Sequence, residues 1–298
     1  MTEVTRGGAP AGKRGRLILV GTPLGNREDL SPRARRTLLE ADLLLCEDTR
    51  SPQRLLALGE DERLPPRISC FVGNEHDRRA VLIEHLERGE QVAFVSEAGL
   101  PVWSDPGRFL VEVAVTAGFE VDVIPGPTAG SCALALSGFP AEGARFLGFL
   151  PRGGKERDAA LAGLVDEPGA ALIYEAGNRT PALLKDLVGL GPAVGMRSLV
   201  IARELSKLHQ EIIRGRVDEL AAALREPLRG EVTVVLAGVA LDGSVDENGD
   251  SKLDPAQVGA RATLEVLLDP GLKPRARAKA LAALTGLDAK LLYDRLRR

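Results

Sequence analysis

The fold of this chain is decided by Leu17-Ile-Leu-Val-Gly-Thr-Pro-Leu-Gly-Asn26 and by its later counterpart Val121-Asp-Val-Ile-Pro-Gly-Pro-Thr-Ala-Gly-Ser131. In each, an apolar run rich in Val, Ile and Leu breaks into Gly, Pro and a hydroxyl residue, which indicates a buried strand that ends in a tight loop. Such loops hold ligands at the carboxyl edge of a parallel sheet. Neither stretch has the spacing of G-x-G-x-x-G or G-x-x-x-x-G-K-S/T, so neither common phosphate-binding loop is predicted.

Strands and helices alternate through the first half of the chain. One helix is expected at 31–40, with Ser31 as its cap and Pro32 at its first position. Further helices are expected at 74–88 and 106–117. The strands are expected at 16–20, 42–46, 67–71, 91–95 and 120–124. This alternation predicts an open, mostly parallel sheet.

The order of expected strands and helices changes after Phe139-Pro140, which we interpret as a hinge between two domains. Further strands are expected at 145–150, 170–174, 198–202, 211–214 and 231–237, with fewer helices between them. The second sheet should be mixed, because 201–214 resembles a hairpin. The predicted fold class is therefore α/β, with two α/β domains, a ligand in the cleft between them, and a small helical C-terminal appendage.

A length of 298 residues favours two principal domains with a small appendage. We expect a disordered N-terminus at 1–15, α/β domains at 16–139 and 140–240, an acidic linker at 241–255 and a small helical basic appendage at 256–298. The three cysteines are far apart, so neither a disulfide framework nor a metal site is predicted. With no long apolar run and a polar, Gly-rich start, we expect a cytoplasmic protein without a membrane partner.

The charge of the chain is unevenly distributed. A net charge of -3 argues against nonspecific coating of nucleic acid. Gly271 to Arg298, however, carries eight Lys or Arg against two Asp, which is compatible either with a solvated helix pair or with RNA contact. Aromatic residues make up only 3% of the chain, so we expect any nucleic acid to be bound by its backbone.

Two loops of the first half carry candidate chemistry. Cys46-Glu-Asp-Thr-Arg50 places two carboxylates, a hydroxyl and a guanidinium at a strand end, although Asp48 or Thr49 could instead cap the next helix. The stretch from Val95 to Gly107 is dense in polar and loop-forming residues. It is longer than a simple connection between a strand and a helix needs to be. Within it, Trp103 either faces a cationic ligand or packs under a lid.

The second half adds a basic loop and two strand ends. Arg152-Gly-Gly-Lys-Glu-Arg157 suits a mobile clamp on phosphates, the alternative being an exposed helix-start turn. Tyr174-Glu175 and Ala202-Arg-Glu-Leu-Ser-Lys207 should reach the cleft, unless they form an ion-pair network that braces the domain.

Several of these motifs together carry a family resemblance. They are Gly21-Thr-Pro-Leu-Gly-Asn26, Glu47-Asp-Thr-Arg50, Gly99-Leu-Pro101, Ser104-Asp-Pro-Gly107, Pro125-Gly-Pro-Thr-Ala129, Phe149-Leu-Pro-Arg152 and Ala202-Arg-Glu-Leu-Ser-Lys207. In this order the chain resembles the ribosomal RNA small subunit methyltransferase I family of the tetrapyrrole methylase-like superfamily. It departs from that family's pattern at Leu100, Trp103 and Gly177-Asn178.

The resemblance implies methyl transfer from S-adenosyl-L-methionine to the ribose 2'-hydroxyl of a cytidine in the decoding region of 16S ribosomal RNA. It implies a homodimer and, as partner, 16S ribosomal RNA or the small ribosomal subunit. The implied cofactor-binding residues are Pro23, Ala98, Gly99, Leu100, Pro101, Trp103, Ser104, Thr128, Ala129, Tyr174, Glu175 and Ala202. Candidate catalytic groups are Asp48, Lys155, Glu204 and Lys207, with Glu47 as a further carboxylate, and candidate RNA contacts are Arg50, Arg152, Lys155, Arg157, Lys273 and Arg275.

Two alternatives remain open from the sequence. One is a superfamily methylase that acts on a small tetrapyrrole or a protein side chain, against which the basic tail and the Arg152 to Arg157 loop count. The other is a noncatalytic RNA-binding relative that has kept the fold.

Overall fold

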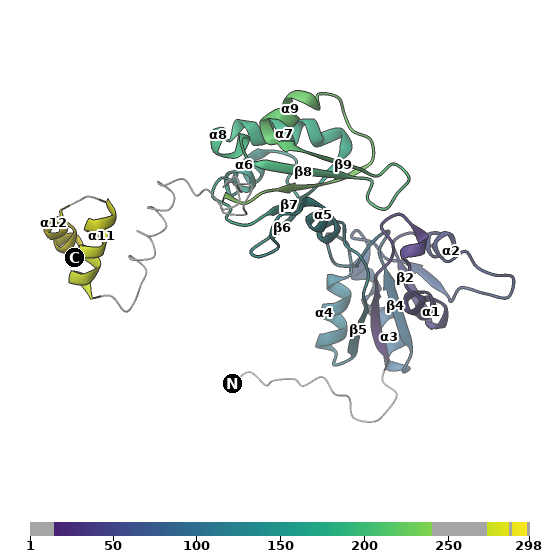
Figure 1. Cartoon of the computed structure of the whole chain (residues 1–298). Helices are drawn as coiled ribbons and strands as arrows, with labels where there is room; N and C mark the ends of the chain where they lie inside the picture. The colour runs from purple at the N-terminus through teal and green to yellow at the C-terminus, as the bar shows by residue number, and fades with distance from the viewer. Residues whose placement is uncertain (1–14, 240–272, 286–287, 297–298) are drawn as a thin grey trace. The chain divides into compact units, whose positions relative to one another are not determined.

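The computed structural model describes residues 15–239, 273–285 and 288–296. The chain forms two compact units, Met1–Val239 and Ala240–Arg298. The first contains two five-stranded sheets (Figure 1). The predicted acidic linker at 241–255 and nearly all of the predicted N-terminal segment lie outside the described residues.

The first sheet is entirely parallel and has the order β3-β2-β4-β1-β5. Its strands are β1 (Arg16–Val20), β2 (Leu43–Cys46), β3 (Arg67–Ser69), β4 (Gln91–Val95) and β5 (Glu120–Ile124). The helical segments that follow them are η1 (Arg27–Asp29), α1 (Pro32–Glu40), α2 (Ser51–Leu56), η2 (Glu75–Arg78), α3 (Arg79–Glu87) and α4 (Arg108–Thr116). The predicted cap of α1 is confirmed, because the Ser31 hydroxyl accepts a hydrogen bond from the Ala34 N–H.

Both faces of this sheet are covered, because successive strand residues point to opposite sides. Leu17 and Phe94 pack with Leu110 of α4 on one face, whereas Ile18 and Ala93 pack on the α1 face. Burial on both faces explains the continuous apolar runs of the strands. It also leaves the strand ends as the places where polar side chains can gather.

The second sheet is mixed, with the order β6-β7-β10-β8-β9, and only β6 and β7 pair in parallel. Its strands are β6 (Arg145–Phe149), β7 (Ala171–Ala176), β8 (Ser198–Arg203), β9 (Glu211–Arg216) and β10 (Glu231–Leu236). The predicted hairpin is confirmed by the antiparallel pair β8 and β9. The described helical segments between these strands are α6 (Gly154–Ala162), η3 (Gly177–Arg179), α7 (Thr180–Gly189), α8 (Pro192–Gly195) and α9 (Val217–Ala223), five against the six between the strands of the first sheet, in agreement with the expectation of fewer helices.

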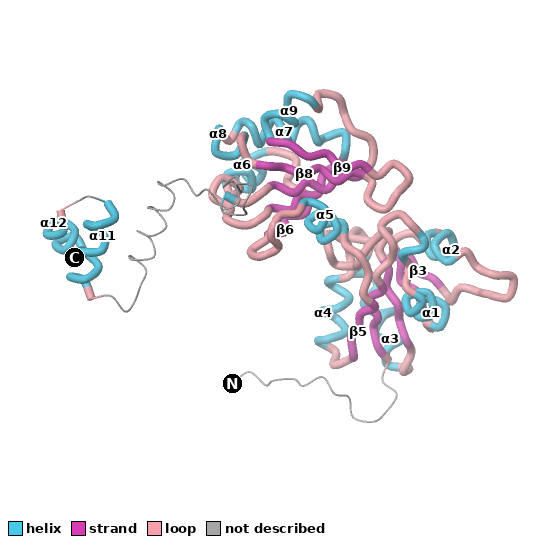
Figure 2. Tube along the Cα trace, in the orientation of Figure 1, coloured by secondary structure: helices cyan, strands magenta, loops and turns pink. Residues whose placement is uncertain are grey.

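Helix α5 (Ala129–Ser137) follows β5 of the first sheet but packs against the second (Figure 2). Ala133 belongs to the same apolar cluster as Val200, Ala202 and Val235. The loop between β5 and α5 therefore carries the chain from one sheet to the other. The predicted domain boundary at 139/140 lies after this helix and stays a prediction.

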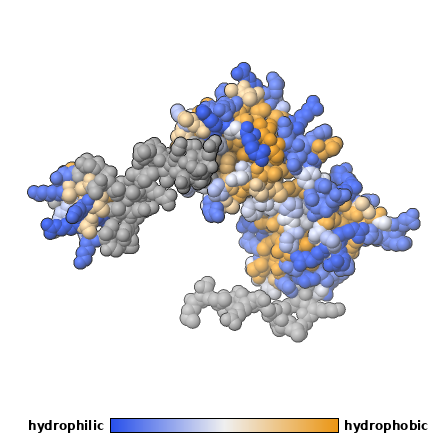
Figure 3. Space-filling view, in the orientation of Figure 1, coloured by the Kyte–Doolittle hydropathy of each residue, from blue (hydrophilic) through white to orange (hydrophobic). Residues whose placement is uncertain are grey.

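Apolar patches interrupt the hydrophilic surface of the first unit in the space-filling view (Figure 3). In the second unit, α11 (Pro274–Thr285) contacts α12 (Ala289–Leu296). Ala278 and Leu281 are buried in α11, whereas Lys273 and Arg275 are exposed. None of the helices in the described ranges has both the length and the apolarity of a membrane span.

Candidate functional site

Three loops meet at the carboxyl edge of the first sheet. The backbones of Thr22 and Gly99 exchange two hydrogen bonds, which join the loops after β1 and β4. The loop after β5 touches the first of these, since a Cβ atom on Gly126 would lie 2.6 Å from the Gly21 Cα. Glycine at both positions is thus needed for the close approach of two backbones. The two stretches that define the fold are packed against each other here.

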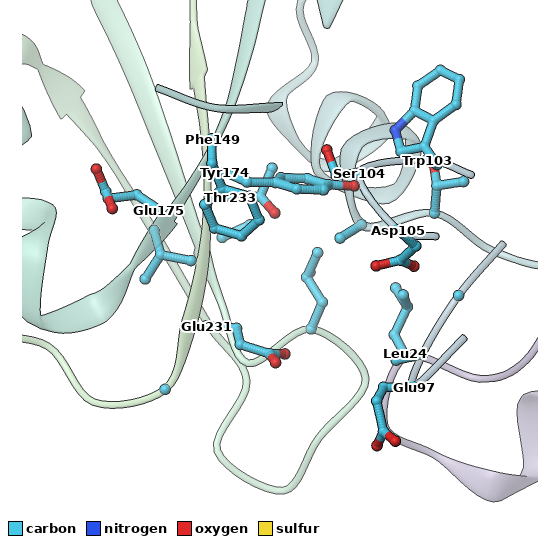
Figure 4. A pocket seen from close by; sticks show the side chains of 18 of the residues that line it. Leu24, Glu97, Trp103, Ser104, Asp105, Phe149, Tyr174, Glu175, Glu231 and Thr233 are labelled. Atoms are coloured by element: carbon cyan, nitrogen blue, oxygen red, sulfur yellow. The ribbon is translucent and has the colours of Figure 1, made fainter. Parts of the chain in front are cut away.

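A pocket of about 330 Å³ lies at this edge and is lined by both sheets (Figure 4). This volume is at the lower end of the range for small-molecule sites. Ten of the predicted cofactor residues line it: Ala98, Gly99, Leu100, Trp103, Ser104, Thr128, Ala129, Tyr174, Glu175 and Ala202. Pro23 and Pro101, also predicted, are buried and do not line it. The cofactor roles of all twelve stay predictions.

The other half of the lining was not predicted. It consists of Leu24, Glu97, Asp105, Phe149, Ala176, Leu205, Gly230, Glu231, Val232 and Thr233. Asp105 and Phe149 stood within the quoted motifs, so a signal for them existed. The segment from Gly230 to Thr233 carries no motif, and only the pairing of β10 between β7 and β8 places it at the pocket.

Carboxylates dominate the charge of the lining. The pKa of Asp105 is raised to about 6, chiefly by burial and also by the negative charges of Glu47, Glu231 and Glu97, while a hydrogen bond with Ser96 acts in the opposite direction. No Lys, Arg or His within the described ranges forms an ion pair with Asp105. A pocket with this excess of negative charge favours a cationic ligand.

Asp48 has a different environment from Asp105. Its carboxylate accepts hydrogen bonds from the Arg50 guanidinium at 2.7 to 3.1 Å, and these lower its pKa to about 2. Asp48 and Thr49 do not cap α2, whose N-cap is Arg50 without a side-chain hydrogen bond. A carboxylate held so firmly in its charged form is a weak proton acceptor.

Glu204 and Lys207 belong to an ion-pair network. The Lys207 ammonium contacts the Glu204 carboxylate at 3.0 Å and the Glu231 carboxylate at 2.8 Å. Burial lowers the pKa of Lys207, but the hydrogen bonds that its ammonium donates to these two carboxylates outweigh burial, and the net shift of the pKa is upward. The Glu231 N–H is the largest cause that lowers the pKa of Glu204. This geometry agrees with the bracing alternative for Ala202 to Lys207.

Glu175 braces the structure in a similar way. Its Oε1 atom accepts a hydrogen bond from the Ala176 N–H at 3.0 Å and lies 3.4 Å from the Arg179 guanidinium. Its Oε2 atom is buried and has no hydrogen-bond partner. The carboxylate points away from Tyr174 and Asp105 in Figure 4.

The predicted basic loop at 152–157 runs into the first turn of α6, and its cations differ in their surroundings. Arg152 and Lys155 are exposed, and no interaction of either with another described residue is found. Arg157 is only 7% exposed, and its guanidinium donates to the Asp186 carboxylate at 2.6 and 2.9 Å and to the Pro151 carbonyl at 2.8 Å. In this structure the Arg157 side chain therefore holds the chain at Pro151, and its contact with RNA stays a prediction.

Aromatic rings form a stack beside the pocket. Trp103 packs on Phe146 at 4.7 Å between ring centroids, and Phe146 meets Tyr174 edge to face at 5.0 Å. Phe149 meets Tyr174 in the same way at 5.6 Å. The Tyr174 hydroxyl accepts a hydrogen bond from the Gly130 N–H at 2.9 Å, which fixes the ring between them. Trp103 packs on another ring and is also 41% exposed. It therefore fits neither alternative fully, that of a ring facing a cationic ligand or that of a ring packed under a lid.

Comparison with protein families gives a match over most of the first unit. The model of the Tetrapyrrole (Corrin/Porphyrin) Methylases matches residues 16–221. The chain is 44% identical over 226 residues to "Ribosomal RNA small subunit methyltransferase I" of Thermotoga maritima, covering 75% of this chain and 99% of that protein. It is 39% identical over 283 residues to the Mycobacterium tuberculosis protein of the same name, covering 94% of each.

Solved structures resemble the fold. Uroporphyrin-III C-methyl transferase from Thermus thermophilus complexed with S-adenyl homocysteine superposes with a TM-score of 0.55 at 24% identity, over 76% of this chain and 98% of that one. Diphthine synthase superposes with a TM-score of 0.56 at 12% identity, over 75% of this chain and 90% of that one. At these identities the likeness concerns the architecture of the two sheets.

Proposed function

Because this chain belongs to the tetrapyrrole methylase family, and within it to the ribosomal RNA small subunit methyltransferase I proteins, we propose that it methylates 16S ribosomal RNA with S-adenosyl-L-methionine. The proposed acceptor is the ribose 2'-hydroxyl of a cytidine in the decoding region. The observation that carries this proposal is the acidic pocket at the carboxyl edge of the first sheet, lined by Glu97, Asp105 and Glu231.

The residues of the pocket fit this cofactor. S-adenosyl-L-methionine supplies an activated methyl group on a positively charged sulfur, and it also carries an ammonium group. The carboxylates of the lining favour both charges, while Leu24, Ala129 and Val232 supply apolar surface. The reaction then requires chiefly that the hydroxyl, methyl group and sulfur be aligned and water be excluded.

Asp105 replaces the earlier candidates as the proposed general base. A ribose hydroxyl is a very weak acid, so a nearby proton acceptor accelerates its attack by about 10² to 10⁴. Asp105 lines the pocket and has a pKa of about 6, so it is charged at neutral pH and close to the ideal range for a base. Asp48, Glu204 and Lys207 stand in ion pairs, and Lys155 is better suited to a phosphate.

Contacts to RNA are proposed for the exposed cations Arg50, Arg152, Lys155, Lys273 and Arg275. Such contacts position a structured RNA through its phosphates. The homodimer, which the resemblance implies, and the cytoplasmic location, which composition and hydropathy suggest, are also proposals.

The test is methylation of small ribosomal subunits from cells that lack this activity, with radiolabelled S-adenosyl-L-methionine and mapping by digestion and mass spectrometry. Label on a single cytidine ribose 2'-oxygen is expected. Binding of the cofactor without labelling of RNA would direct the search to tetrapyrrole or protein acceptors. Absence of cofactor binding at millimolar concentration would favour a noncatalytic RNA-binding protein.

A further inference from the structure

Aromatic side chains are scarce in this chain but concentrated at the pocket. The sequence contains seven Phe, two Tyr and one Trp. Phe149 and Tyr174 line the pocket together with Trp103, and Phe146 packs between Trp103 and Tyr174. Phe149 is the more exposed of the two exposed rings that line the pocket, at 61% against 41% for Trp103. Aromatic side chains that line a cavity commonly contact the ligand, and the exposed face of Phe149 is free to do so.

The Phe149 ring contacts one aromatic neighbour. It meets Tyr174 edge to face, with an interplanar angle of 68°. Tyr174 cannot turn freely, because its hydroxyl is bound to the Gly130 N–H and its ring lies against Phe146. Phe149 therefore rests against a ring that is itself held in place, and it presents an exposed aromatic surface beside the pocket.

Free cations follow this ring directly. Arg152 is three residues after Phe149, so their Cα atoms lie within about 10 Å of each other. The Arg157 guanidinium anchors the intervening chain at the Pro151 carbonyl. A Cβ atom added to Gly153 would meet nothing within 4 Å, so the loop has space around it for a ligand. An aromatic face and a nearby guanidinium together match the base and the phosphate of one nucleotide.

We propose that Phe149 is the platform on which the nucleobase of the acceptor nucleotide stacks, with Arg152 at its phosphate. The inference rests on the proposed function and deepens it by assigning a subsite for the substrate. Since the ribose joins base and phosphate, a base on Phe149 leaves the sugar beside the pocket that contains Asp105. A base in this position must be unstacked from its RNA neighbours, as sequence-specific recognition of single-stranded RNA requires.

The test compares Phe149→Leu and Phe149→Trp with Phe71→Leu, a control at a phenylalanine that is 45% exposed and does not line the pocket. For each variant, the KM for small ribosomal subunits and the Kd of S-adenosylhomocysteine are measured. Phe149→Leu should raise the KM by on the order of 10-fold, because it removes base stacking. Phe149→Trp should retain the wild-type KM, and the Kd should stay within about 2-fold in all three, since nucleobase stacking does not involve the cofactor.

Two results would overturn the proposal. An unchanged KM in Phe149→Leu would show that no base stacks there. A weakened Kd for S-adenosylhomocysteine with an unchanged KM would assign the ring to the adenine of the cofactor instead. Both are distinct from failure of the proposed function, in which the wild-type protein itself would not methylate the subunits.

Discussion

Asp48 and Asp105 follow neighbouring strands of one sheet but have opposite electrostatic environments. The Arg50 guanidinium holds the pKa of Asp48 at about 2. Burial and nearby carboxylates raise the pKa of Asp105 to about 6. The same functional group thus acts as a fixed charge at one position and as a titrating group at the other.

Replacing Asp105 with Asn should reduce kcat by on the order of 100-fold, because the proposed proton acceptor is lost. In the wild-type protein, kcat should rise with pH through about 6 as Asp105 loses its proton. The variant should lack this rise. Measurements of kcat in methylation assays between pH 5 and 8 test both effects. The control is Asp122→Asn, which changes a carboxylate on β5 that does not line the pocket.

As pH rises through about 6, the contribution of Asp105 to the stability of the fold should fall, whereas kcat should rise. The folded-state pKa of Asp105 lies above its ordinary value of 3.8, so folding favours the protonated form. The stability that this provides is fully present below pH 3.8 and is lost as pH rises through about 6. Asp105→Asn should therefore raise Tm relative to wild type at pH 8, with a smaller difference at pH 4. A lower Tm at pH 8 would contradict the cause assigned to the pKa shift.

At the scale of elements, the site depends on how closely the ends of strands approach. The loops after β1 and β5 touch through Gly21 and Gly126, and the loop after β4 is bonded to the first of them. These contacts bring Leu24, Gly99 and Thr128 to one pocket. The pattern of apolar residues predicts each strand separately. The close approach of the loops depends instead on the absence of a side chain at Gly21 and Gly126.

Gly126→Ala should lower the free energy of unfolding by about 1 to 3 kcal/mol, because the new methyl group would collide with the backbone of Gly21. It should also weaken the binding of S-adenosylhomocysteine. Gly189→Ala is a suitable control, since a Cβ atom at this end of α7 meets nothing within 4 Å. Urea unfolding of both variants measures the difference, and equal stabilities would refute the steric argument.

At the scale of the whole molecule, charge is divided between the two compact units. The pocket is built entirely from residues of the first unit and is acidic. The second unit begins its described part with the exposed cations Lys273 and Arg275. Cofactor binding and RNA binding should therefore respond to different substitutions.

The double variant Lys273→Gln/Arg275→Gln should weaken binding to small ribosomal subunits and reduce the dependence of log K on log salt by up to about 2, one for each lost phosphate contact. The Kd of S-adenosylhomocysteine should not change. Arg88→Gln/Arg108→Gln removes the same charge from exposed helix ends of the first unit and serves as the control. An equal loss of affinity in both double variants would indicate an effect of net charge alone.

Local sequence patterns determined much of this protein. The strands at Arg16–Val20, Gln91–Val95 and Glu120–Ile124 were predicted at their observed bounds, and the Ser31 cap was predicted as well. Such features depend on hydrophobic periodicity and on hydrogen bonds between neighbouring residues, both of which are visible in a short window. The family motifs likewise indicated which loops meet at the pocket.

Tertiary structure alone decided three other features. It packed α5 on the second sheet, turned Arg157 inward to Asp186, and placed the half-buried Asp105 near carboxylates from distant segments. Burial and electrostatic potential are sums over neighbours far apart in the chain, so no local pattern contains them. The sequence therefore supplies the candidate groups, and their packing determines which of them are exposed, which are held in ion pairs and which line the pocket.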